Sequence, residues 1–362
     1  MVSKILEKLV TFKSLSMNHA ENKKALNYIS SQLKGLPVYI KLFESNSFPS
    51  LTITTKKTKK PKLWLQGHFD VVSAPSKLFK AKYKGSKMFA RGVYDMKYAT
   101  ACYIQLLKDL GSDLPKYDFG IMITTDEEIG GFNGVAKLLD SGYSSKLCFL
   151  PDGGESWCFQ ESSKGILQLK VEAKGKSAHG SRPWEGENAL EILFSFLEEV
   201  KLLFPKEPCG DRSHYHKSIN IGKIEGGVST NQVPASAIAN LDIRFTPEEN
   251  SAKIFSNIKM VAKRYKNVVV NKIIDEPSTK ADKENGYVKL FSKIVFDKFK
   301  IKTGFTKSHG SSDARHFAKH KIPTVLIRPE GGNIHSDTEW IDIKELNKFY
   351  EALKEFVTQI SK

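Results

Sequence analysis

Cysteine is scarce in this sequence, and no two cysteines form a CxxC pair. The four in the 362-residue chain are Cys102, Cys148, Cys158 and Cys209. So few cysteines in so long a chain exclude a disulfide framework and favour a reducing compartment. We therefore expect small, buried, apolar cysteine side chains in a cytoplasmic protein.

Long apolar runs are also lacking. No stretch approaches the ~20 apolar residues of a membrane-spanning helix. The N-terminus has neither the continuous apolar segment nor the small-residue cleavage site of a signal peptide. Hydrophobic residues make up 40% of the chain and charged residues 27%, which is typical of a soluble globular protein with a sizeable core. The length suits two domains, or one large domain with an insertion.

Acidic residues are outnumbered, 40 against 56 basic ones, and the formal net charge is +16. Such a charge could indicate nucleic-acid binding, but the lysines are scattered. The dense run KKTKKPK, Lys56 to Lys62, lies between two strand-like segments, where a solvated hairpin loop is expected. We regard nucleic acid as an unlikely partner and interpret the charge as a general attraction for anionic small molecules.

Helical and extended patterns alternate over the first 160 residues, which indicates an α/β sheet with helices on both faces. Helical patterns cover residues 2–34, 96–110 and 134–142. Extended patterns cover residues 38–43, 50–55, 63–72, 118–125 and 146–150. Near the C-terminus the pattern returns to helix, strand and helix, with PTVLIRP (323–329) predicted as a buried strand.

The middle of the chain follows a different plan. Residues 166–174, 218–224, 236–245 and 268–274 are strand-like, and residues 188–204 and 246–265 are helical, with a capping signal at Thr246 to Glu249. The order β-α-β-β-α-β is that of a ferredoxin-like module. We predict a discontinuous first domain, residues 1–163 and 276–362, interrupted by an inserted domain, residues 164–275.

Five segments carry acids and histidines at places where an α/β sheet positions function, just after a strand or before a helix. They are GHFD with His68 and Asp70, GVYDMK with Asp95, DEE with Glu127 and Glu128, PDGG with Asp152, and GGNIHSD with His335. Imidazole and carboxylate together suit zinc and its neighbours in the transition series.

Each segment has a simpler interpretation when taken alone. His68 and Asp70 could serve packing or a turn, Asp95 could be a helix N-cap, and Asp152 could be a turn residue. Five such segments in one chain favour a metal site instead. Two metal ions need a bridging carboxylate and terminal ligands. Adjacent residues at a strand end point in different directions, so one of Glu127 and Glu128 can bind metal while the other faces the water.

The motifs GHFDVV, ARGVYDMK, TTDEEIGG, SAHGSRPWEGENA and NIHSDTEW resemble, in order and spacing, those of a di-zinc amidohydrolase family. That family includes acetylornithine deacetylase, succinyl-diaminopimelate desuccinylase, aminoacylase and glutamate carboxypeptidase. The resemblance covers nearly the whole chain. It implies a zinc-peptidase-type α/β catalytic domain and an inserted ferredoxin-like lid that forms a homodimer.

Carried over residue by residue, the resemblance implies two Zn²⁺ ions per subunit, with Co²⁺ or Mn²⁺ as substitutes. His68 and Asp152 would bind one ion, Glu128 and His335 the other, and Asp95 both. Glu127 would be the general base and acid, and Asp70 would orient the ring of His68.

In the lid, the resemblance makes His179 an oxyanion donor, often to the active site of the partner subunit. Asn231, Arg244, Ser312 and Arg315 match substrate-binding positions, and the fork of Arg244 suits a carboxylate. As alternatives, Arg244 could form a surface ion pair and Asn231 a turn.

The resemblance implies metal-dependent hydrolysis of an amide bond in a small carboxylate-bearing substrate, an N-acyl-amino acid in the first instance. Several positions differ from the common deacylase pattern. Pro151-Asp152-Gly153 replaces a Glu-Pro pair, Tyr98-Ala99 replaces Gly-Gly, and Thr338-Glu339 replaces Asn-Glu. An aspartate at the position of Asp152 resembles the dipeptidase and tripeptidase branches of the family. A dipeptidase or carboxypeptidase activity is therefore kept as an alternative. A further alternative, outside the enzymes, is a binding or scaffold protein that has this fold but no catalytic activity.

Overall fold

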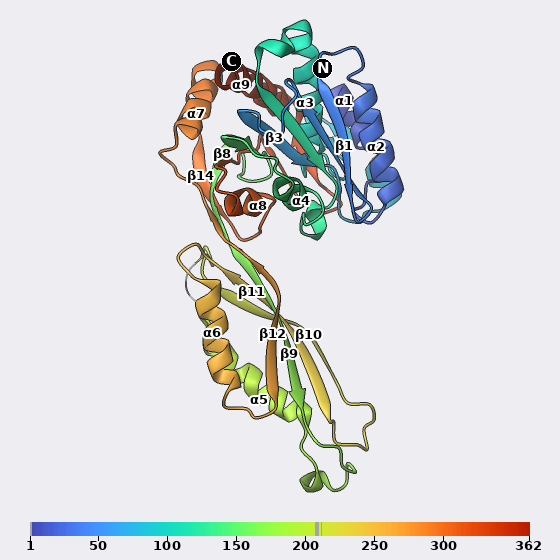
Figure 1. The fold of residues 1–362 in the computed structure, drawn as a ribbon, viewed down its shortest axis with the longest axis vertical. Helices are drawn as coiled ribbons and strands as arrows, with labels where there is room; N and C mark the ends of the chain where they lie inside the picture. The colour runs from blue at the N-terminus through green and yellow to red at the C-terminus, as the bar shows by residue number, and fades with distance from the viewer. Residues whose placement is uncertain (1, 207–209, 211) are drawn as a thin grey trace. The chain divides into compact units, whose positions relative to one another are not determined.

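Two units make up the chain, each with its own sheet and its own hydrophobic core (Figure 1). The computed structural model describes residues 2–206, 210 and 212–362. The first unit consists of Met1–Glu161, Ala281–Ser308 and Ser312–Lys362, and the second of Ser162–Lys280 with His309–Ser311. The chain thus leaves the first unit after Glu161, builds the second, and returns to the first at Ala281.

A six-stranded sheet forms the centre of the first unit. Its strands are β1 (Tyr39–Ser45), β2 (Phe48–Thr54), β3 (Leu63–His68), β6 (Phe119–Thr124), β7 (Leu147–Phe149) and β15 (Thr324–Val325). Their order is β1-β2-β6-β3-β7-β15. The four strands from β6 to β15 are parallel, and β2 and β1 extend the sheet antiparallel. Parallel strands bring their carboxyl ends to one edge, where an α/β sheet places its site.

Helices cover this sheet in two groups (Figure 1). The first group combines helices from the N-terminal and C-terminal parts of the chain, which pack against one another. Its members are α1 (Val2–Leu9), α3 (Lys97–Leu110), α7 (Gly286–Phe299) and α9 (Ile343–Ile360). The other is the pair α4 (Val135–Asp140) and α8 (Ala314–Lys319), while α2 (His19–Ser31) packs beside β2. In the core, the ring of Phe349 on α9 lies 5.7–6.3 Å from the rings of Tyr98, Phe149, Trp157 and Phe291.

Short elements complete the chain. The strands are β4 (Lys82–Lys84), β5 (Lys87–Phe89), β8 (Cys158–Ser163), β13 (Thr279–Lys280), β14 (Gly304–Ser308), β16 (Gly331–Gly332) and β17 (Trp340–Asp342). The 3-10 turns are η1 (Ser76–Phe79), η2 (Gly111–Lys116), η3 (Glu127–Ile129) and η4 (Pro183–Glu185). β16, β17, β5 and β4 form a small antiparallel sheet in that order.

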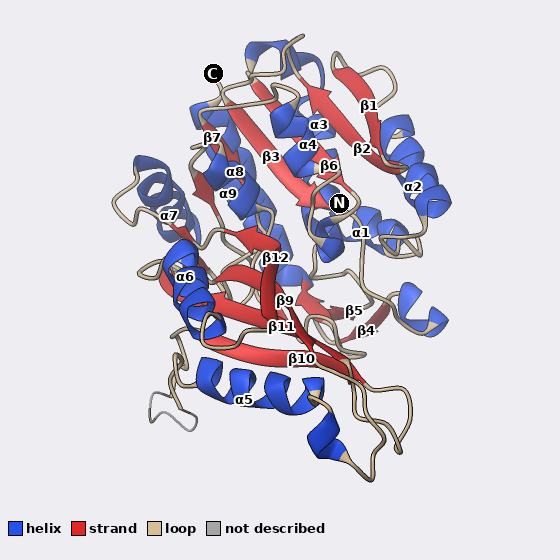
Figure 2. Ribbon diagram, turned by 60° about the horizontal axis from the view of Figure 1, so that its bottom comes forward, coloured by secondary structure: helices blue, strands red, loops and turns tan. Residues whose placement is uncertain are grey.

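The second unit has the strand and helix order predicted for the inserted domain (Figure 2). It contains β9 (Gly165–Lys174), α5 (Ala189–Lys201), β10 (Ser218–Gly226), β11 (Ser236–Phe245), α6 (Ser251–Ala262) and β12 (Val268–Glu276). The sheet is antiparallel, with the order β10-β11-β9-β12. Alternate residues of β9 are buried in the core that α5 and α6 share, the period expected of a sheet with one covered face.

Three local expectations are wrong. The helical pattern of residues 2–34 is two helices, because a new N-cap begins at Asn18, whose side chain accepts a bond from the backbone N–H of Glu21. KKTKKPK does not close a hairpin, since β6 lies between β2 and β3. The cap of α6 is Asn250 rather than the Thr246 to Glu249 signal, because the Asn250 side chain accepts from two backbone N–H groups.

The predicted strand at residues 323–329 shortens to the two residues of β15, which pair with β7. Beyond β15 the backbone pairs instead with residues 157–160, since the Leu326 carbonyl accepts the N–H of Gln160 and the Arg328 carbonyl accepts the N–H of Trp157. Cys102 and Cys148 are buried, Cys158 is half-buried, and all three are free thiols, whereas Cys209 lies outside the described residues. Among the described helices, none combines the length and the apolarity that crossing a membrane requires.

Candidate metal centre

The predicted ligands gather at the carboxyl edge of the parallel strands. His68 is the last residue of β3, Glu127 and Glu128 follow β6 in η3, and Asp152 follows β7. Asp95 precedes α3, and His335 lies between β16 and β17. Asp95 does not cap the helix, because the N-cap residue of α3 is Met96 and no side chain bonds there. All six residues belong to the first unit.

Two groups of potential ligands form within this cluster. His68, Glu127 and Asp152 bring one ligand atom each within 4.8 Å of one another, and so do Asp95, Glu128 and His335. Each group holds one imidazole and two carboxylates, the donor set that suits zinc and similar divalent ions.

Asp95 links the two groups. Its Oδ1 lies 3.4 Å from Nε2 of His68, and its Oδ2 lies 3.0 Å from Nε2 of His335. Glu128 Oε2 is 3.2 Å from the same nitrogen of His335. Ligand atoms about 2.0–2.1 Å from a tetrahedral ion are ~3.3 Å apart, so these separations fit metal coordination. A carboxylate that faces both imidazoles with different oxygens is suited to bridge two ions.

An unpartnered nitrogen supports the same conclusion. Nε2 of His68 is buried and has no hydrogen-bond partner among the described residues, although buried polar atoms are almost always bonded. The nearest acceptors are Asp95 Oδ1 at 3.4 Å and Asp152 Oδ1 at 3.8 Å. These separations are too long for good hydrogen bonds but suit a nitrogen and two oxygens that bind a common cation. The residues present therefore fit a divalent metal.

The surroundings of the cluster raise the pKa of several of its residues. Hydrogen bonds to Asp95 and Glu128 raise the pKa of His335 to about 10. Burial works against charge on His68, yet the carboxylates of Asp152, Asp70 and Asp95 around its ring raise its pKa well above the usual value. Burial and the nearby Asp152 carboxylate raise the pKa of Glu127 strongly. A carboxyl that accepts a proton so readily suits a general base, and bound cations would lower this pKa.

Asp70 supports both His68 and the glutamates. Its Oδ1 lies 3.4 Å from Nδ1 of His68, and its two oxygens accept the backbone N–H groups of Glu127 at 3.2 Å and Glu128 at 3.1 Å. Ser16, in the break between α1 and α2, donates its hydroxyl to Asp70 at 2.7 Å. Asp70 therefore orients the imidazole and fixes the loop that carries the predicted base.

The DEEIGG turn is shaped by Asp126 and two glycines. Asp126 is buried, and its Oδ2 accepts the backbone N–H groups of Asn133 and Gly134. Gly130 and Gly131 have φ values of +114° and +64°, which glycine adopts without strain. A Cβ at Gly131 would lie 2.1 Å from Oδ1 of Asp313. This turn therefore requires glycine and turns the chain directly after Glu127 and Glu128.

Helix α8 holds the same turn from the other side. Arg315, predicted to bind substrate, is buried and donates to the carbonyl oxygen of Gly130 at 2.7 Å. His316 donates to that oxygen at 2.9 Å. Ser312 is buried, and its hydroxyl accepts the backbone N–H of Ala314. These contacts give Arg315 a role in holding the turn, and substrate binding by Ser312 and Arg315 stays a prediction.

Three further candidates lie in the second unit. The ring of His179 is bonded to the hydroxyl of Ser181 at 2.8 Å, and Asn231 Oδ1 accepts from Ser229. Arg244 forms two bonds with the carboxylate of Asp242, at 2.6 and 3.1 Å. The fork of Arg244 thus binds a carboxylate of its own strand. The roles predicted for His179, Asn231 and Arg244 stay predictions.

Two residues of the site were not predicted as site residues. Glu339 is buried and accepts the backbone N–H groups of Gly92, Tyr94 and Asp95 at 2.9–3.1 Å while pairing with Arg91. It therefore holds the loop that presents Asp95. Arg328 is buried beside Asp95 and Asp152. Glu339 lies in the NIHSDTEW motif, where it was noted only as a difference from the family pattern, and Arg328 lies outside the motifs. Only their three-dimensional neighbours show what these two side chains do.

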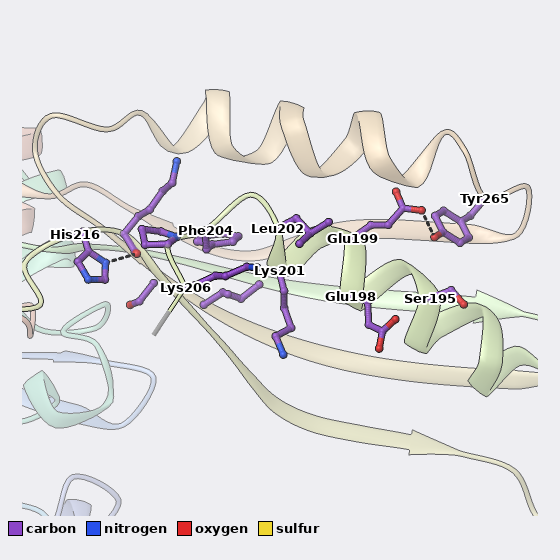
Figure 3. Close-up of a pocket in the computed structure, with 13 residues that line it drawn as sticks. Ser195, Glu198, Glu199, Lys201, Leu202, Phe204, Lys206, His216 and Tyr265 are labelled. Atoms are coloured by element: carbon purple, nitrogen blue, oxygen red, sulfur yellow. Dashed lines mark hydrogen bonds between the residues drawn. The ribbon is translucent and has the colours of Figure 1, made fainter. Parts of the chain in front are cut away.

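A cavity of about 900 Å³ lies elsewhere, in the second unit, between the end of α5 and the start of β10 (Figure 3). Apolar side chains such as Leu202 and Phe204 line it, with Lys201, Lys206 and Glu198 among the polar ones. Neither ligand group includes a residue that lines this cavity.

The chain matches known proteins over almost its whole length. A family model described as "Peptidase family M20/M25/M40" matches residues 64–359. The chain is 28% identical to proteins named succinyl-diaminopimelate desuccinylase from Rickettsia akari and Rickettsia felis, covering 98% of both chains in each comparison.

Two solved structures are similar in fold. Aminopeptidase PepT from Bacillus cereus has a TM-score of 0.79 at 20% identity, covering 100% of this chain and 98% of its own. The M20 family metallo-carboxypeptidase Sso-CP2 from Sulfolobus solfataricus has a TM-score of 0.77 at 18% identity, covering 99% of each chain.

Proposed function

The chain belongs to peptidase family M20/M25/M40 and is a metallohydrolase of amide bonds, and from this premise we propose that its substrate is a small carboxylate-bearing N-acyl-amino acid. The observation that carries the proposal is the pair of histidine–carboxylate groups linked by Asp95, with Glu127 beside them. The similarity to proteins named succinyl-diaminopimelate desuccinylase supports an N-acyl substrate. The net charge of +16 favours an anionic one.

The proposed centre holds two Zn²⁺ ions, for which Co²⁺ or Mn²⁺ could substitute. His68 and Asp152 would hold one ion, Glu128 and His335 the other, and Asp95 both. Divalent ions held by these residues would lower the pKa of a bound water towards ~7 and polarise the scissile carbonyl. Asp70 keeps the ring of His68 in its ligand orientation through the contact at Nδ1.

Glu127 performs the proton transfers in this proposal. Its carboxylate takes a proton from the attacking water and then delivers that proton to the leaving amine. Asp70 anchors the backbone N–H of Glu127, and α8 anchors the turn behind it through the Gly130 carbonyl. The base therefore sits on a loop that is fixed from two sides.

The second unit supplies the remaining parts of the proposal. His179 would donate to the oxyanion, and Asn231 and Arg244 would bind the substrate, with Arg244 exchanging Asp242 for the substrate carboxylate. A homodimer through this unit is proposed as well. It is supported by β10, which lies at an edge of its sheet with mostly exposed residues, since edge strands favour pairing. A cytoplasmic location is supported by the scarcity of cysteine.

A dipeptidase or carboxypeptidase is the second candidate. Asp152, where deacylases commonly have glutamate, favours it, as does the fold similarity to an aminopeptidase and a carboxypeptidase. A non-catalytic binding protein is the third candidate, and the complete set of predicted ligands together with Glu127 counts against it.

A substrate panel with metal analysis tests the proposal. Purified protein loaded with Zn²⁺ or Co²⁺ is assayed against N-acetyl and N-succinyl amino acids in parallel with dipeptides and tripeptides. We expect a kcat/KM at least a hundredfold higher for an N-acyl substrate than for any peptide. The reverse preference would establish a peptidase. A purified protein that binds no divalent metal and hydrolyses nothing would establish the binding protein.

A further inference from the structure

Arg328 brings a permanent positive charge into the candidate centre. The residue follows β15 and is 6% exposed. Its Nη2 lies 3.4 Å from Oδ1 of Asp95 and bonds Oδ1 of Asp152. The guanidinium also lies over the ring of Tyr94, 5.4 Å from the centroid. An arginine keeps its charge at any physiological pH, so this cation is present whether or not metal is bound.

The positive charge of Arg328 lies next to one of the two ligand groups, the one that contains His68 and Asp152. The two oxygens that face Arg328 are the same ones that face Nε2 of His68, at 3.4 Å for Asp95 and 3.8 Å for Asp152. The other oxygen of Asp95 faces His335. Arg328 forms ion pairs with Asp95 and Asp152 only, as far as the described residues show. Arg328 is therefore a neighbour of the His68 position and not of the His335 position.

Resting on the proposed two-metal function, we propose that Arg328 is a positioning residue that stands in for metal at the His68–Asp152 position and weakens divalent binding there. In the metal-free protein it neutralises two buried carboxylates that would otherwise repel each other. A divalent ion bound at this position would be repelled by the guanidinium charge. It would also compete with the guanidinium for the same oxygens of Asp95 and Asp152. The two positions therefore differ in their affinity for a divalent ion, and the Asp95–Glu128–His335 position binds it more tightly.

Titration of the chelator-treated full-length protein with Co²⁺ tests this role, followed by calorimetry and by the visible absorption of bound cobalt. We expect two binding steps at least tenfold apart in Kd in the wild type. His68→Ala should remove the weaker step and His335→Ala the tighter one. Arg328→Gln, which retains an N–H donor without the charge, should tighten the weaker step at least tenfold and change the tighter step less than threefold.

Two controls separate charge at the site from charge in general. Arg328→Lys keeps the cation and should retain the wild-type difference. Arg264→Met removes one exposed positive charge from the second unit, where Arg264 pairs with Glu199, and should leave both steps unchanged. Melting of the metal-free proteins gives an independent readout, because Arg328→Gln should lower the melting temperature before metal is added and less after it.

The outcomes distinguish the two proposals. A wild type that binds no Co²⁺ would overturn the proposed function. Two Co²⁺ steps of equal affinity in the wild type, or an Arg328→Gln protein with an unchanged weaker step, would overturn the role of Arg328 and leave the proposed function standing. The wild-type titration can overturn the proposal even if no Arg328 variant folds.

Discussion

Glu127 and Glu128 are neighbours in the chain but belong to different ligand groups. Glu127 lies with His68 and Asp152, whereas Glu128 lies 3.2 Å from His335. Neighbouring side chains diverge in this way because η3 follows a strand and is tied at both backbone N–H groups to Asp70. The proposed division of work between a base and a ligand follows from these different surroundings.

Replacing Glu127 by glutamine tests the role of the base. Glutamine has nearly the same shape but cannot accept the proton from water, so kcat should fall by about 10²–10⁴-fold. The measurement is steady-state kinetics with the substrate found in the panel, together with the metal content of the variant. Metal content should match the wild type. Turnover within tenfold of the wild type would exclude Glu127 as the base.

His316 provides a pH test that involves no predicted ligand. Burial lowers the pKa of His316 to about 3, below the ordinary value of 6.5 in an unfolded chain. Above pH 6.5 neither state takes up this proton. Between pH 6.5 and about 3 the unfolded state binds it and the native state does not, so the native fold loses up to about 1.4 kcal/mol of stability per pH unit.

His316→Gln keeps an N–H donor for the Gly130 carbonyl and removes this titration. We expect the wild type to lose stability faster than the variant as the pH falls from 7 to 5, measured by urea unfolding of chelator-treated proteins. The neighbour Asp313, whose pKa burial raises to about 7, acts with the opposite sign in both proteins. Parallel pH profiles of the wild type and His316→Gln would show that His316 is not held neutral.

The local sequence pattern predicted most of the strands and helices, but it did not predict the order of the strands in the sheet. The alternation of strands and helices predicted an α/β sheet, and the candidate site positions were chosen because function lies at the carboxyl ends of strands in such a sheet. The break between α1 and α2 was missed because residues 10–18 continue an apolar pattern while Asn18 starts a new helix. The position of β6 between β2 and β3 is a non-local pairing, which no turn signal encodes.

Single charged residues escaped prediction for a related reason. Glu339 and Arg328 act through contacts more than 170 residues away in the chain, with the backbone of Asp95 and with the Asp152 carboxylate. Neither contact leaves a periodic pattern or a spacing. Most of the predicted ligands carried a sequence signal because they follow a predicted strand or precede a predicted helix.

Helix α9 supports the sheet through one aromatic residue above all. Phe349 is fully buried and meets rings from α3, α7 and β7. Phe349→Ala should destabilise the first unit by about 3–5 kcal/mol because a large cavity remains. Glu351→Ala, an exposed change on the same helix, should alter stability by less than about 0.5 kcal/mol. Urea unfolding of both variants measures the difference, and equal effects would contradict this account of the core.

At the scale of the whole molecule, the two hydrophobic cores share no residue. One core draws on the first unit, and the other on β9, α5, β11, α6 and β12. All predicted metal ligands belong to the first unit. A ligand stabilises the part of a protein that binds it in the native state, by about 2.7 kcal/mol at a hundred times its Kd.

Scanning calorimetry should therefore resolve two unfolding transitions, of which a divalent metal raises only one. Leu193→Ala, a fully buried change on α5, should lower the other transition, because the cavity costs the second core about 2–5 kcal/mol. Phe349→Ala should lower the metal-sensitive transition instead. If metal and both variants shift one common transition together, the two units unfold as a single cooperative body, and the separate cores do not act as separate folding units.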